Sequence, residues 1–407
     1  MTEPGTASLP TPHAGTARTW LWLGAIILLG LNLRPFLAAT GTIAANIRMD
    51  TGLGFQGMAW LTLVPMALMG AGAFVAPALQ VRIGARNALL GALAMLALGC
   101  ALRLTPSAGY LLILTAALCG AGVAVVQAVL PGLIKRQFPE TVAPVMGLYS
   151  AALLAGGALG GQLTPMVQSA TESWRMALAA WALPALFACL AAAAILPREL
   201  KHRVNSTGIP AVTLLGRPRT WLLIICFGLG NGGYASLIAW LAPYYQSRGW
   251  TAFDSGSLIA WMSVAQALAA LIIPALAARG RDRRPWIWLT LALQATGFAA
   301  FAFAPDLAPR AWVVAMGAGL GGYFALTLIV ALDHFPDPRK AGALSAMMQG
   351  GGFILASTGP WVAAGLRDLS GTFTTAWILH VCEIVLVAML VQRLCPTRYG
   401  VAVGDTS

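Results

Sequence analysis

One arginine stands next to a proline in an otherwise apolar stretch of the sequence, residues 29 to 41, which reads LGLNLRPFLAATG. A guanidinium group carries a permanent positive charge and five N–H donors in a planar fork, which matches the oxygens of carboxylates and similar anions. Such a charge costs at least about 2.5 kcal/mol inside hydrocarbon. Arg34 therefore predicts an anion-binding position, unless its side chain reaches the membrane surface or caps the carbonyls of a neighbouring helix.

The chain offers Arg34 few carboxylates as partners. Of thirteen acidic residues, twelve lie in tails, loops or predicted helix ends, and Glu383 alone lies well inside an apolar span. An arginine without a protein carboxylate leaves its charge for a bound anion to neutralise. Helical spacing puts Gly30, Ala38 and Gly41 on the same face as Arg34, which leaves room beside the guanidinium. The same small residues could equally mark a helix-packing surface.

Two neighbours of Arg34 shape the helix around it. Pro35 cannot donate to the carbonyl of Leu31, so a kink is predicted there, and the freed carbonyl needs another donor. Asn32 could supply that donor or could bind the ion. It lies about 200° around the helix from Arg34, so both side chains reach one small ion only if the helix kinks.

The composition predicts an integral membrane protein. Hydrophobic residues make up 58% of the chain and charged residues 9%, and the mean hydropathy is +0.77. The six cysteines lie inside or at the ends of apolar runs, without the spacing of metal ligands. We therefore expect no metal site, no disulfide framework and no cofactor.

Twelve apolar windows are long enough to cross a bilayer. A hydrocarbon core of about 30 Å needs about twenty apolar residues per helix. The predicted spans are 19–40, 57–80, 87–104, 109–134, 144–169, 175–196, 220–245, 255–278, 286–304, 310–332, 341–366 and 374–394.

The positive charges are distributed by topology, so the net charge of +12 is not taken as a sign of nucleic-acid binding. Eighteen of the twenty-five basic residues fall in the two ends and in every second connection. The opposite connections carry one each, namely Arg48, Arg103, Arg175, Arg248, Arg310 and Arg367. The positive-inside rule then places both termini in the cytoplasm, and Arg34 is the one basic residue left over.

The chain also repeats itself with a nearly constant offset. Three short matches share an offset of 197 and three more share an offset of 195. The matches are PAL at 77–79 and 274–276, GAG at 120–122 and 317–319, FP at 138–139 and 335–336, SA at 150–151 and 345–346, GG at 156–157 and 351–352, and Pro165 and Pro360.

The repeat predicts two six-helix halves in the same orientation, which is the plan of major facilitator transporters. We expect an all-α membrane protein with halves at 19–196 and 220–396 and a cytoplasmic linker at 197–219. Residues 1–18 are expected to form a disordered cytoplasmic tail, and residues 397–407 a second cytoplasmic tail.

Several longer motifs resemble one branch of that superfamily. They are LNLRP in the first span, VQAVLPGLIKRQFPETVAPVMGLYSAALLAGGALGG across the fourth and fifth, GNGGYASLIAWLAPYY in the seventh and GLGGYFALTLIVALDH in the tenth. Together they resemble the bacterial cyanate permease family, which also includes nitroimidazole transporters. The loop VRIGARN resembles the superfamily's loop with Arg82, Gly84 and Arg86 in register, although Val81 takes the place of its acidic residue.

The resemblance implies a secondary transporter of a small anion, cyanate, working by alternating access in the bacterial inner membrane. It also implies that the first, fourth, seventh and tenth spans line a central cavity. The polar candidates beside Arg34 and Asn32 are then Gln127, Asn231, Tyr234, Tyr323 and Gln349, each with a packing or gating role as the alternative. The glycines of GLGNGGY are expected to break the seventh helix.

His380 and Glu383 are three residues apart in the last span and would be neighbours on one helix face. They could form a proton relay or a satisfied pair between packed helices. The scarcity of buried acids favours uniport or exchange of an anion, and proton symport stays open.

Three other functions are alternatives to anion transport, namely transport of an aromatic compound, sensing and catalysis. A neutral or weakly acidic aromatic compound would need a larger cavity, lined by Trp60, Phe36, Tyr149 and Tyr234. A non-transporting sensor would need an output domain. An enzyme would need a cluster of nucleophile and base, paired carboxylates or a phosphate loop, and none is found in the sequence. The expected partners are a small anion and the lipid bilayer, with no nucleic acid, and the chain is expected to be monomeric.

Overall fold

The computed structural model describes residues 13–105, 108–138, 141–197, 211–280, 282–335 and 338–399. All elements in this part of the chain are helices. They are α1 (His13–Leu31), α2 (Pro35–Thr42), α3 (Ala44–Thr51), α4 (Phe55–Ile83), α5 (Ala85–Ala101), η1 (Leu102–Leu104), α6 (Gly109–Gln137), α7 (Val142–Thr171), α8 (Trp174–Ala179), α9 (Ala182–Ile195), η2 (Ala211–Gly216), α10 (Pro218–Gln246), α11 (Ala252–Ala277), α12 (Arg284–Phe303), α13 (Pro309–Leu332), α14 (Pro338–Ser357), α15 (Gly359–Ser370), α16 (Thr374–Val391) and η3 (Pro396–Arg398).

The predicted all-α membrane fold is confirmed. Ten segments of the described chain are long and apolar enough to cross a membrane. The two other predicted spans correspond to α7 and to the pair α14 and α15. α1 begins at His13, directly after Pro12, so it starts inside the predicted disordered tail. Residues 1–12, 198–210 and 400–407, which include most of the predicted linker and C-terminal tail, lie outside the described residues.

The first predicted span is broken, as its proline suggested, and the consequence is larger than a kink. α1 ends at Leu31 and α2 begins at Pro35, with Asn32, Leu33 and Arg34 between them. Pro35 has no N–H to donate to the carbonyl of Leu31 and has a fixed φ, so it suits the first turn of a new helix. The broken segment therefore places Arg34 immediately before the N-terminus of α2.

The predicted break in the seventh span is wrong, because α10 runs unbroken through the glycines. These glycines serve close packing. A Cβ on Gly230 would lie 2.3 Å from the ring of Tyr323, and one on Gly233 would lie 2.4 Å from Phe298. Glycine keeps its backbone N–H, so the helical hydrogen bonds persist where neighbouring side chains fill the space.

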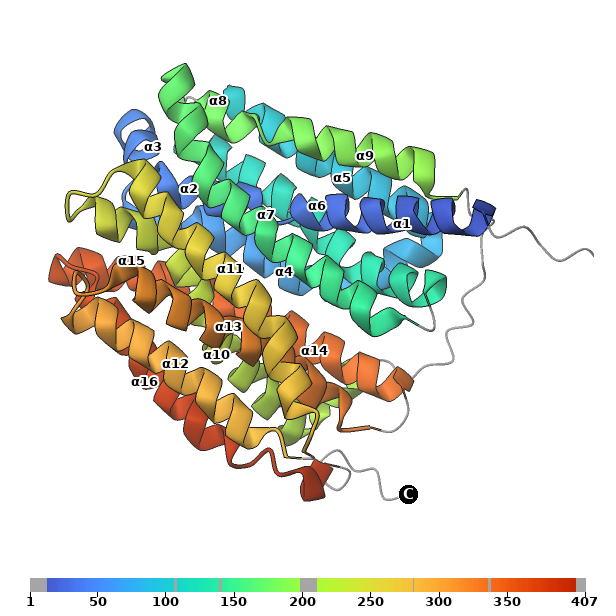
Figure 1. The fold of residues 1–407 in the computed structure, drawn as a ribbon. Helices are drawn as coiled ribbons and strands as arrows, with labels where there is room; N and C mark the ends of the chain where they lie inside the picture. Colours follow the sequence, from blue (N-terminus) through green and yellow to red (C-terminus); the bar gives the residue numbers. More distant parts are fainter. Residues whose placement is uncertain are drawn as a thin grey trace, which may run out of the picture.

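The helices form two bundles that lie against each other (Figure 1). α1 to α9, coloured blue to green, form one bundle, and α10 to α16, coloured yellow to red, form the other. The bundles meet where α7 packs on α11, where α4 packs on α14 and α15, and where α2 packs on α10. We call the side at which α1 begins and η3 lies the terminal side, and the side that holds α3 and the end of α15 the far side.

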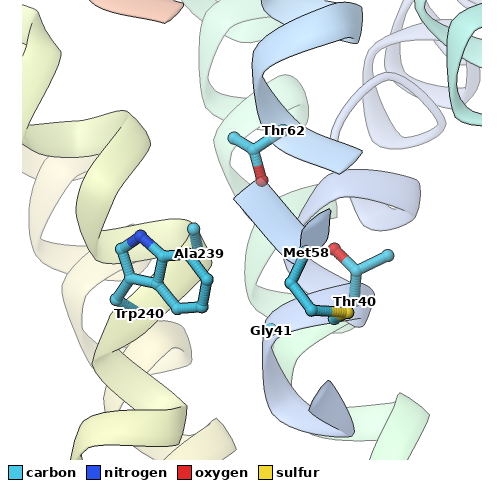
Figure 2. A pocket seen from close by; sticks show the side chains of 6 residues that line it. All are labelled: Thr40, Gly41, Met58, Thr62, Ala239 and Trp240. Carbon is cyan, nitrogen blue, oxygen red and sulfur yellow. The ribbon is translucent and has the colours of Figure 1, made fainter. Parts of the chain in front are cut away.

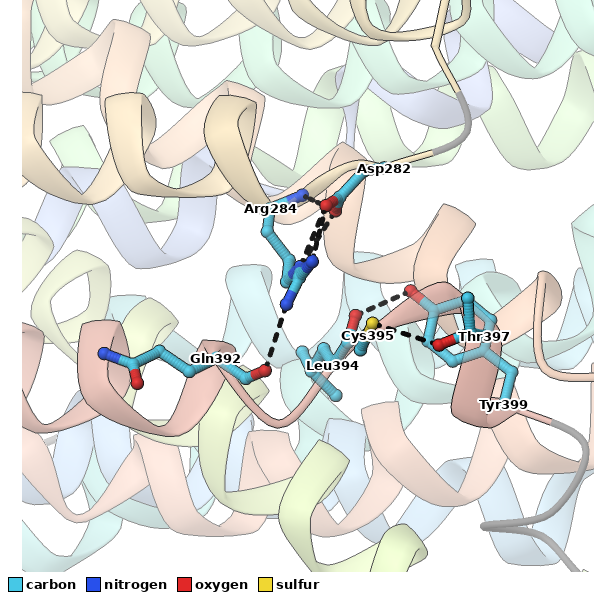
Figure 3. Close-up of polar contacts among 7 residues, drawn as sticks. All are labelled: Asp282, Arg284, Gln392, Leu394, Cys395, Thr397 and Tyr399. Atoms are coloured by element: carbon cyan, nitrogen blue, oxygen red, sulfur yellow. Dashed lines mark hydrogen bonds and ion pairs between the residues drawn. The ribbon is translucent and has the colours of Figure 1, made fainter.

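On the terminal side, the segment after α16 is held by polar contacts (Figure 3). Arg284 forms an ion pair with Asp282 at 2.7 Å and donates from Nη1 to the carbonyl of Gln392 at 3.3 Å. The hydroxyl of Tyr399 donates to the carbonyl of Leu394 at 3.2 Å. The segment therefore stays against the start of α12.

A buried cluster fixes the same segment from the other direction. Arg219 at the start of α10 donates from Nη1 to the carbonyl of Arg393 at 2.6 Å and from Nε to Nε2 of His334 at 3.0 Å. The ring of His334 stacks on Tyr399, with centroids 4.0 Å apart. Burial and the neighbouring Arg219 charge lower the pKa of His334 to about 4, so the imidazole is neutral at pH 7 and its Nε2 can accept.

Candidate functional site

The backbone around Arg34 follows from the proline beside it. The N–H of Asn32 donates to Leu29 at 3.2 Å and that of Leu33 donates to Gly30 at 3.1 Å, so α1 ends in a tightened last turn. The carbonyl of Arg34 then accepts from Leu37 and Ala38 at 3.1 and 3.2 Å and starts α2. Arg34 is thereby fixed between two helices, and its side chain is 5% exposed.

The guanidinium of Arg34 is buried without a hydrogen-bond partner at Nε or Nη1 among the described residues. Its carbon lies 5.1 Å from the centroid of the Tyr234 ring on α10. A Cβ on Gly157 would lie 3.6 Å from Arg34 Cβ and 3.6 Å from Ser263 Oγ on α11. Helices from both bundles therefore surround Arg34.

None of the ion pairs formed by described residues includes Arg34. Asp50 pairs with Arg175, Asp306 pairs with Arg248, and Glu383 pairs with His380. A buried cation without a carboxylate is costly, and a charge-assisted hydrogen bond to an anion offsets that cost. The described residues contain no cluster of His, Cys, Asp or Glu that could hold a metal ion. The arrangement around Arg34 can bind a small anion.

Asn32 supports the broken segment in a different way from the one expected. Its Nδ2 donates to the carbonyl of Leu28 at 2.8 Å, and not to that of Leu31. The carbonyl of Leu31 instead packs on Gly156 of α7, where a Cβ would lie only 2.2 Å from that oxygen. Asn231 on α10 repeats the bond of Asn32, because its Nδ2 donates to the carbonyl of Phe227 at 2.8 Å. Both asparagines are thus engaged with the carbonyl one turn earlier.

The small residues near Arg34 on its own helix are used for packing. A Cβ on Gly30 would lie 2.9 Å from Cβ of Ala152, and one on Gly41 would lie 2.4 Å from the carbonyl oxygen of Ile238. Of the two interpretations left open, the packing surface is the one that these contacts support.

The remaining candidates from the sequence are placed as follows. Tyr234 contacts Arg34 through its ring, as described above. Tyr323 is fully buried and donates to the carbonyl of Cys226 at 2.6 Å, so its hydroxyl ties α13 to α10 and is already engaged. Gln349 donates to Ser345 Oγ at 3.3 Å within α14. Gln127 on α6 is half-buried. Within the described residues, no hydrogen bond or ring contact joins Tyr323, Gln349 or Gln127 to Arg34.

His380 and Glu383 do form a pair on α16. His380 Nδ1 lies 2.7 Å from Glu383 Oε2, and its Nε2 has no partner among the described residues. The imidazole is 2% exposed and lies against Phe298 of α12, with centroids 4.8 Å apart. The pair belongs to the contact between α16 and α12, one aromatic ring away from Gly233.

Sequence reasoning missed three residues near this region. Gly157 and Ser263 lie on the fifth and eighth spans, which the resemblance did not place at the cavity. Arg103 was assigned to an exposed connection, yet it is fully buried and donates from Nη1 to the carbonyl of Phe36 at 3.2 Å. The sequence around Arg103 gave no sign of this burial, because the group that accepts its hydrogen bond lies on α2, far away in the sequence.

A small cavity lies between α2, α4 and α10 (Figure 2). The space open to the centre of a water molecule is about 10 Å³, which is room for about one water. The residues that line it are Thr40, Gly41, Met58, Thr62, Ala239 and Trp240.

Known proteins resemble this chain in sequence and in fold. Residues 22–360 match the family model described as the Major Facilitator Superfamily. The chain is 41% identical over 374 residues to the cyanate transport protein CynX of Escherichia coli, covering 92% of this chain and 97% of that protein. It is 29% identical over 392 residues to the 2-nitroimidazole transporter of Escherichia coli, covering 95% and 98%.

A crystal structure of a D-xylose-proton symporter superposes with a TM-score of 0.74 at 15% sequence identity, covering 91% of this chain and 96% of the other. At that identity the likeness shows the fold.

Proposed function

Because the chain belongs to the major facilitator superfamily, we propose that it moves a small anion, cyanate, across the membrane by alternating access and binds that anion at Arg34. The chain is a multi-pass membrane protein and a secondary transporter of the superfamily.

The observation that carries the proposal is the uncompensated charge of Arg34. The side chain is 5% exposed, two of its nitrogens lack partners among the described residues, and a Tyr234 ring lies at 5.1 Å. An arginine at this depth costs at least about 2.5 kcal/mol. A bound anion offsets that cost, and the anion can be released when the protein changes conformation. The substrate then supplies the counter-charge.

The size of the surroundings favours a small ion over an aromatic compound. Of the four aromatic residues expected to line a larger cavity, Trp60 is 42% exposed and Phe36 is 1% exposed, its carbonyl bonded to Arg103. Tyr234 remains beside Arg34. Cyanate is a linear anion of three atoms with acceptors at both ends, which suits the two unpartnered nitrogens of Arg34. The name of the relative CynX supports the same substrate.

The packing of the first span suggests how access would alternate. α2 packs on α7 of its own bundle and also on α10 and α11 of the other, whereas α1 packs mainly on α7 and α9 of its own bundle. We infer that this state is closed on the far side of Arg34 and that transport requires α2 and α10 to separate. The excess of basic residues on the terminal side supports a cytoplasmic placement of both termini in a bacterial inner membrane.

Transport of an anion has an energetic direction. A membrane potential that is negative inside opposes anion uptake by about 2.3 kcal/mol per 100 mV. Uptake would need consumption of the anion in the cytoplasm, exchange for another anion, or a coupling ion. The His380 and Glu383 pair is the proton-linked candidate for the last of these.

The test is uptake of labelled cyanate into proteoliposomes that contain the purified protein. Arg34→Ala is expected to lower kcat/KM at least about 100-fold. Removing one partner of a buried ion pair costs about 3 to 5 kcal/mol, and each 1.4 kcal/mol corresponds to a factor of ten. Arg34→Lys is expected to retain part of the flux, since the charge remains while the planar fork is lost. Arg310→Ala is the matched control, because Arg310 is exposed at the start of α13.

Competition sharpens the result. A nitroimidazole and bicarbonate are added separately against labelled cyanate, and 2-nitroimidazole uptake is measured directly. Full cyanate uptake by Arg34→Ala would contradict the binding role of Arg34. Saturable uptake of 2-nitroimidazole without any cyanate uptake would contradict the substrate and favour a neutral aromatic compound.

A further inference from the structure

Besides the buried Arg103, four arginines on the far side lie over aromatic rings, and two of them form hydrogen-bonded ion pairs. Arg175 forms an ion pair with Asp50, and Arg248 forms a two-bonded ion pair with Asp306. The other two, Arg48 and Arg367, share a single phenyl ring, that of Phe55. The two pairs therefore differ in how their charges are compensated.

Phe55 lies between the two guanidinium groups. The guanidinium carbon of Arg48, on α3, is 3.7 Å from the ring centroid, and that of Arg367, on α15, is also 3.7 Å from it. The two carbons cannot be farther apart than twice that distance. Since α3 belongs to one bundle and α15 to the other, this ring joins the bundles at the far side.

The two positive charges at Phe55 share one nearby carboxylate. Arg367 lies 3.6 Å from Asp368, and Arg48 donates from Nε to the carbonyl of Leu53 at 3.2 Å. Burial, together with the Arg367 charge, lowers the pKa of Arg48. Both guanidinium groups stay protonated at neutral pH, so a net positive charge remains at this point of the far side.

Phe55 also contacts two aromatic rings of the second bundle. Its ring packs on Trp240 at 5.7 Å and on Phe373 at 5.8 Å. Trp240 in turn lines the small cavity whose other wall includes Thr40 of α2, the helix that starts at Arg34. The two arginines lie outermost on the far side. The Phe55 and Trp240 rings, the cavity and α2 follow in that order toward the interior.

We propose that Arg48 and Arg367 form an anion-recruiting site at the far-side entrance of the transporter, with Phe55 as the ring that closes it. The inference rests on the proposed transport of a small inorganic anion and adds where that anion is first attracted. When the bundles separate, Arg48 moves with α3 and Arg367 moves with α15, and the two like charges are released from the ring they share. The open entrance then presents two cations to solution, which raises the local concentration of anions.

The first test measures cyanate influx from the far side in intact cells that express Arg48→Gln, Arg367→Gln or both. Each single variant is expected to lower kcat/KM about threefold to fivefold at low ionic strength through KM, with kcat unchanged, and the double variant is expected to lose most of the salt dependence. Arg248→Gln is the matched control, because it removes the same charge from the same side at a residue already paired with Asp306.

The second test does not depend on transport. Leu369, two residues after Arg367 and 88% exposed, is changed to Cys. Its reaction rates with membrane-impermeant methanethiosulfonate reagents, one anionic and one cationic, are compared after subtraction of the labelling of the parent chain. The ratio of anionic to cationic rates is expected to fall about fivefold per arginine removed by Arg48→Gln or Arg367→Gln, and less for Arg248→Gln.

The outcomes separate this inference from the proposed function. Unchanged KM, unchanged salt dependence and an unchanged rate ratio in the Arg48 and Arg367 variants, with Arg34→Ala still inactive, would overturn the recruiting site and leave Arg34 as the transport site. A lowered rate ratio in a protein that moves no anion would keep the charged entrance and overturn the substrate. A fall in kcat with KM unchanged would make the two arginines gate residues and would contradict recruitment.

Discussion

The first helices of the two bundles carry similar segments with opposite outcomes. Asn32 in the first bundle and Asn231 in the second each donate from Nδ2 to the carbonyl four residues earlier, at 2.8 Å in both cases. The helix is broken at the first asparagine, which lies between α1 and α2, and α10 continues through the second. The two segments therefore share a side-chain bond and differ in the backbone.

The difference lies in the residues that follow. NLRP ends in a proline, so the carbonyl of Leu31 lacks a helical N–H donor and packs against Gly156 instead. NGGY keeps every N–H. Glycine lowers helix propensity, yet hydrogen bonds inside a membrane are obligatory because no water replaces them. In the first bundle the break coincides with a missing donor, whereas low propensity alone leaves α10 continuous. A proline does not break every span, because α6 continues through Pro131.

The two segments also divide the chemistry between the bundles. The broken one supplies the charge of Arg34, and the continuous one supplies the ring of Tyr234, which lies 5.1 Å from it. An anion bound at Arg34 would therefore be held at the contact between the bundles, where separation of α2 from α10 alters both partners at once. Under the proposed function, occupancy of the site would be coupled to the relative position of the bundles.

The largest expected effect comes from filling the space that supports the break. In Gly156→Ala the new Cβ would meet the carbonyl oxygen of Leu31 at 2.2 Å, and backbone on both sides must shift. We expect a loss of about 3 kcal/mol of stability, at the upper end for overpacking. Gly232→Ala is the control on the continuous helix, since its nearest neighbour lies at 3.8 Å. Thermal unfolding in detergent measures both, and equal Tm values would contradict the role of Gly156.

The next prediction repairs the break. Pro35→Ala restores an N–H that can bond to Leu31, so α1 and α2 are expected to approach one continuous helix and to turn Arg34 away from Tyr234. We expect kcat/KM for cyanate to fall about 30-fold, or about 2 kcal/mol, with normal folding. Pro131→Ala is the control, because Pro131 lies inside α6, which stays continuous. Wild-type uptake by Pro35→Ala would show that the break is not needed to position Arg34.

The sequence predicted what depends on local composition and failed where tertiary contacts decide. The apolar windows gave the spans, and the charge of Arg34 within one of them pointed to a site, because both follow from the cost of polar groups in hydrocarbon. The burial of Arg103 and the bond from Tyr323 to Cys226 depend on helices far away in the sequence. The continuity of α10 had the same origin, since Tyr323 and Phe298 fill the space beside its glycines.

A smaller effect is expected when the shared asparagine bond is removed from each segment. Near the break, the backbone N–H of Asn32 donates to Leu29 and not to Leu28. The carbonyl of Leu28 instead accepts from the side chain of Asn32. Asn32→Ala is therefore expected to cost about 1 to 2 kcal/mol for an unsatisfied buried carbonyl. In α10 the carbonyl of Phe227 also receives the regular helical bond, so Asn231→Ala is expected to cost less than about 0.5 kcal/mol. Equal losses of Tm in the two variants would contradict this difference.

The smallest effect tests the ring that the continuous helix contributes. Tyr234→Phe keeps an aromatic face over Arg34 and is expected to leave the apparent affinity for cyanate within about twofold, because the attraction comes from the ring and not from the hydroxyl. Tyr234→Leu removes the ring while keeping an apolar side chain, and a cation–π contact of about 1 kcal/mol corresponds to a loss of about fivefold. Competition by unlabelled cyanate against labelled uptake measures both variants under one condition. If Phe and Leu reduce affinity equally, the hydroxyl is the group that matters, and Tyr234 acts as a hydrogen-bond donor to the anion instead of as a partner of Arg34.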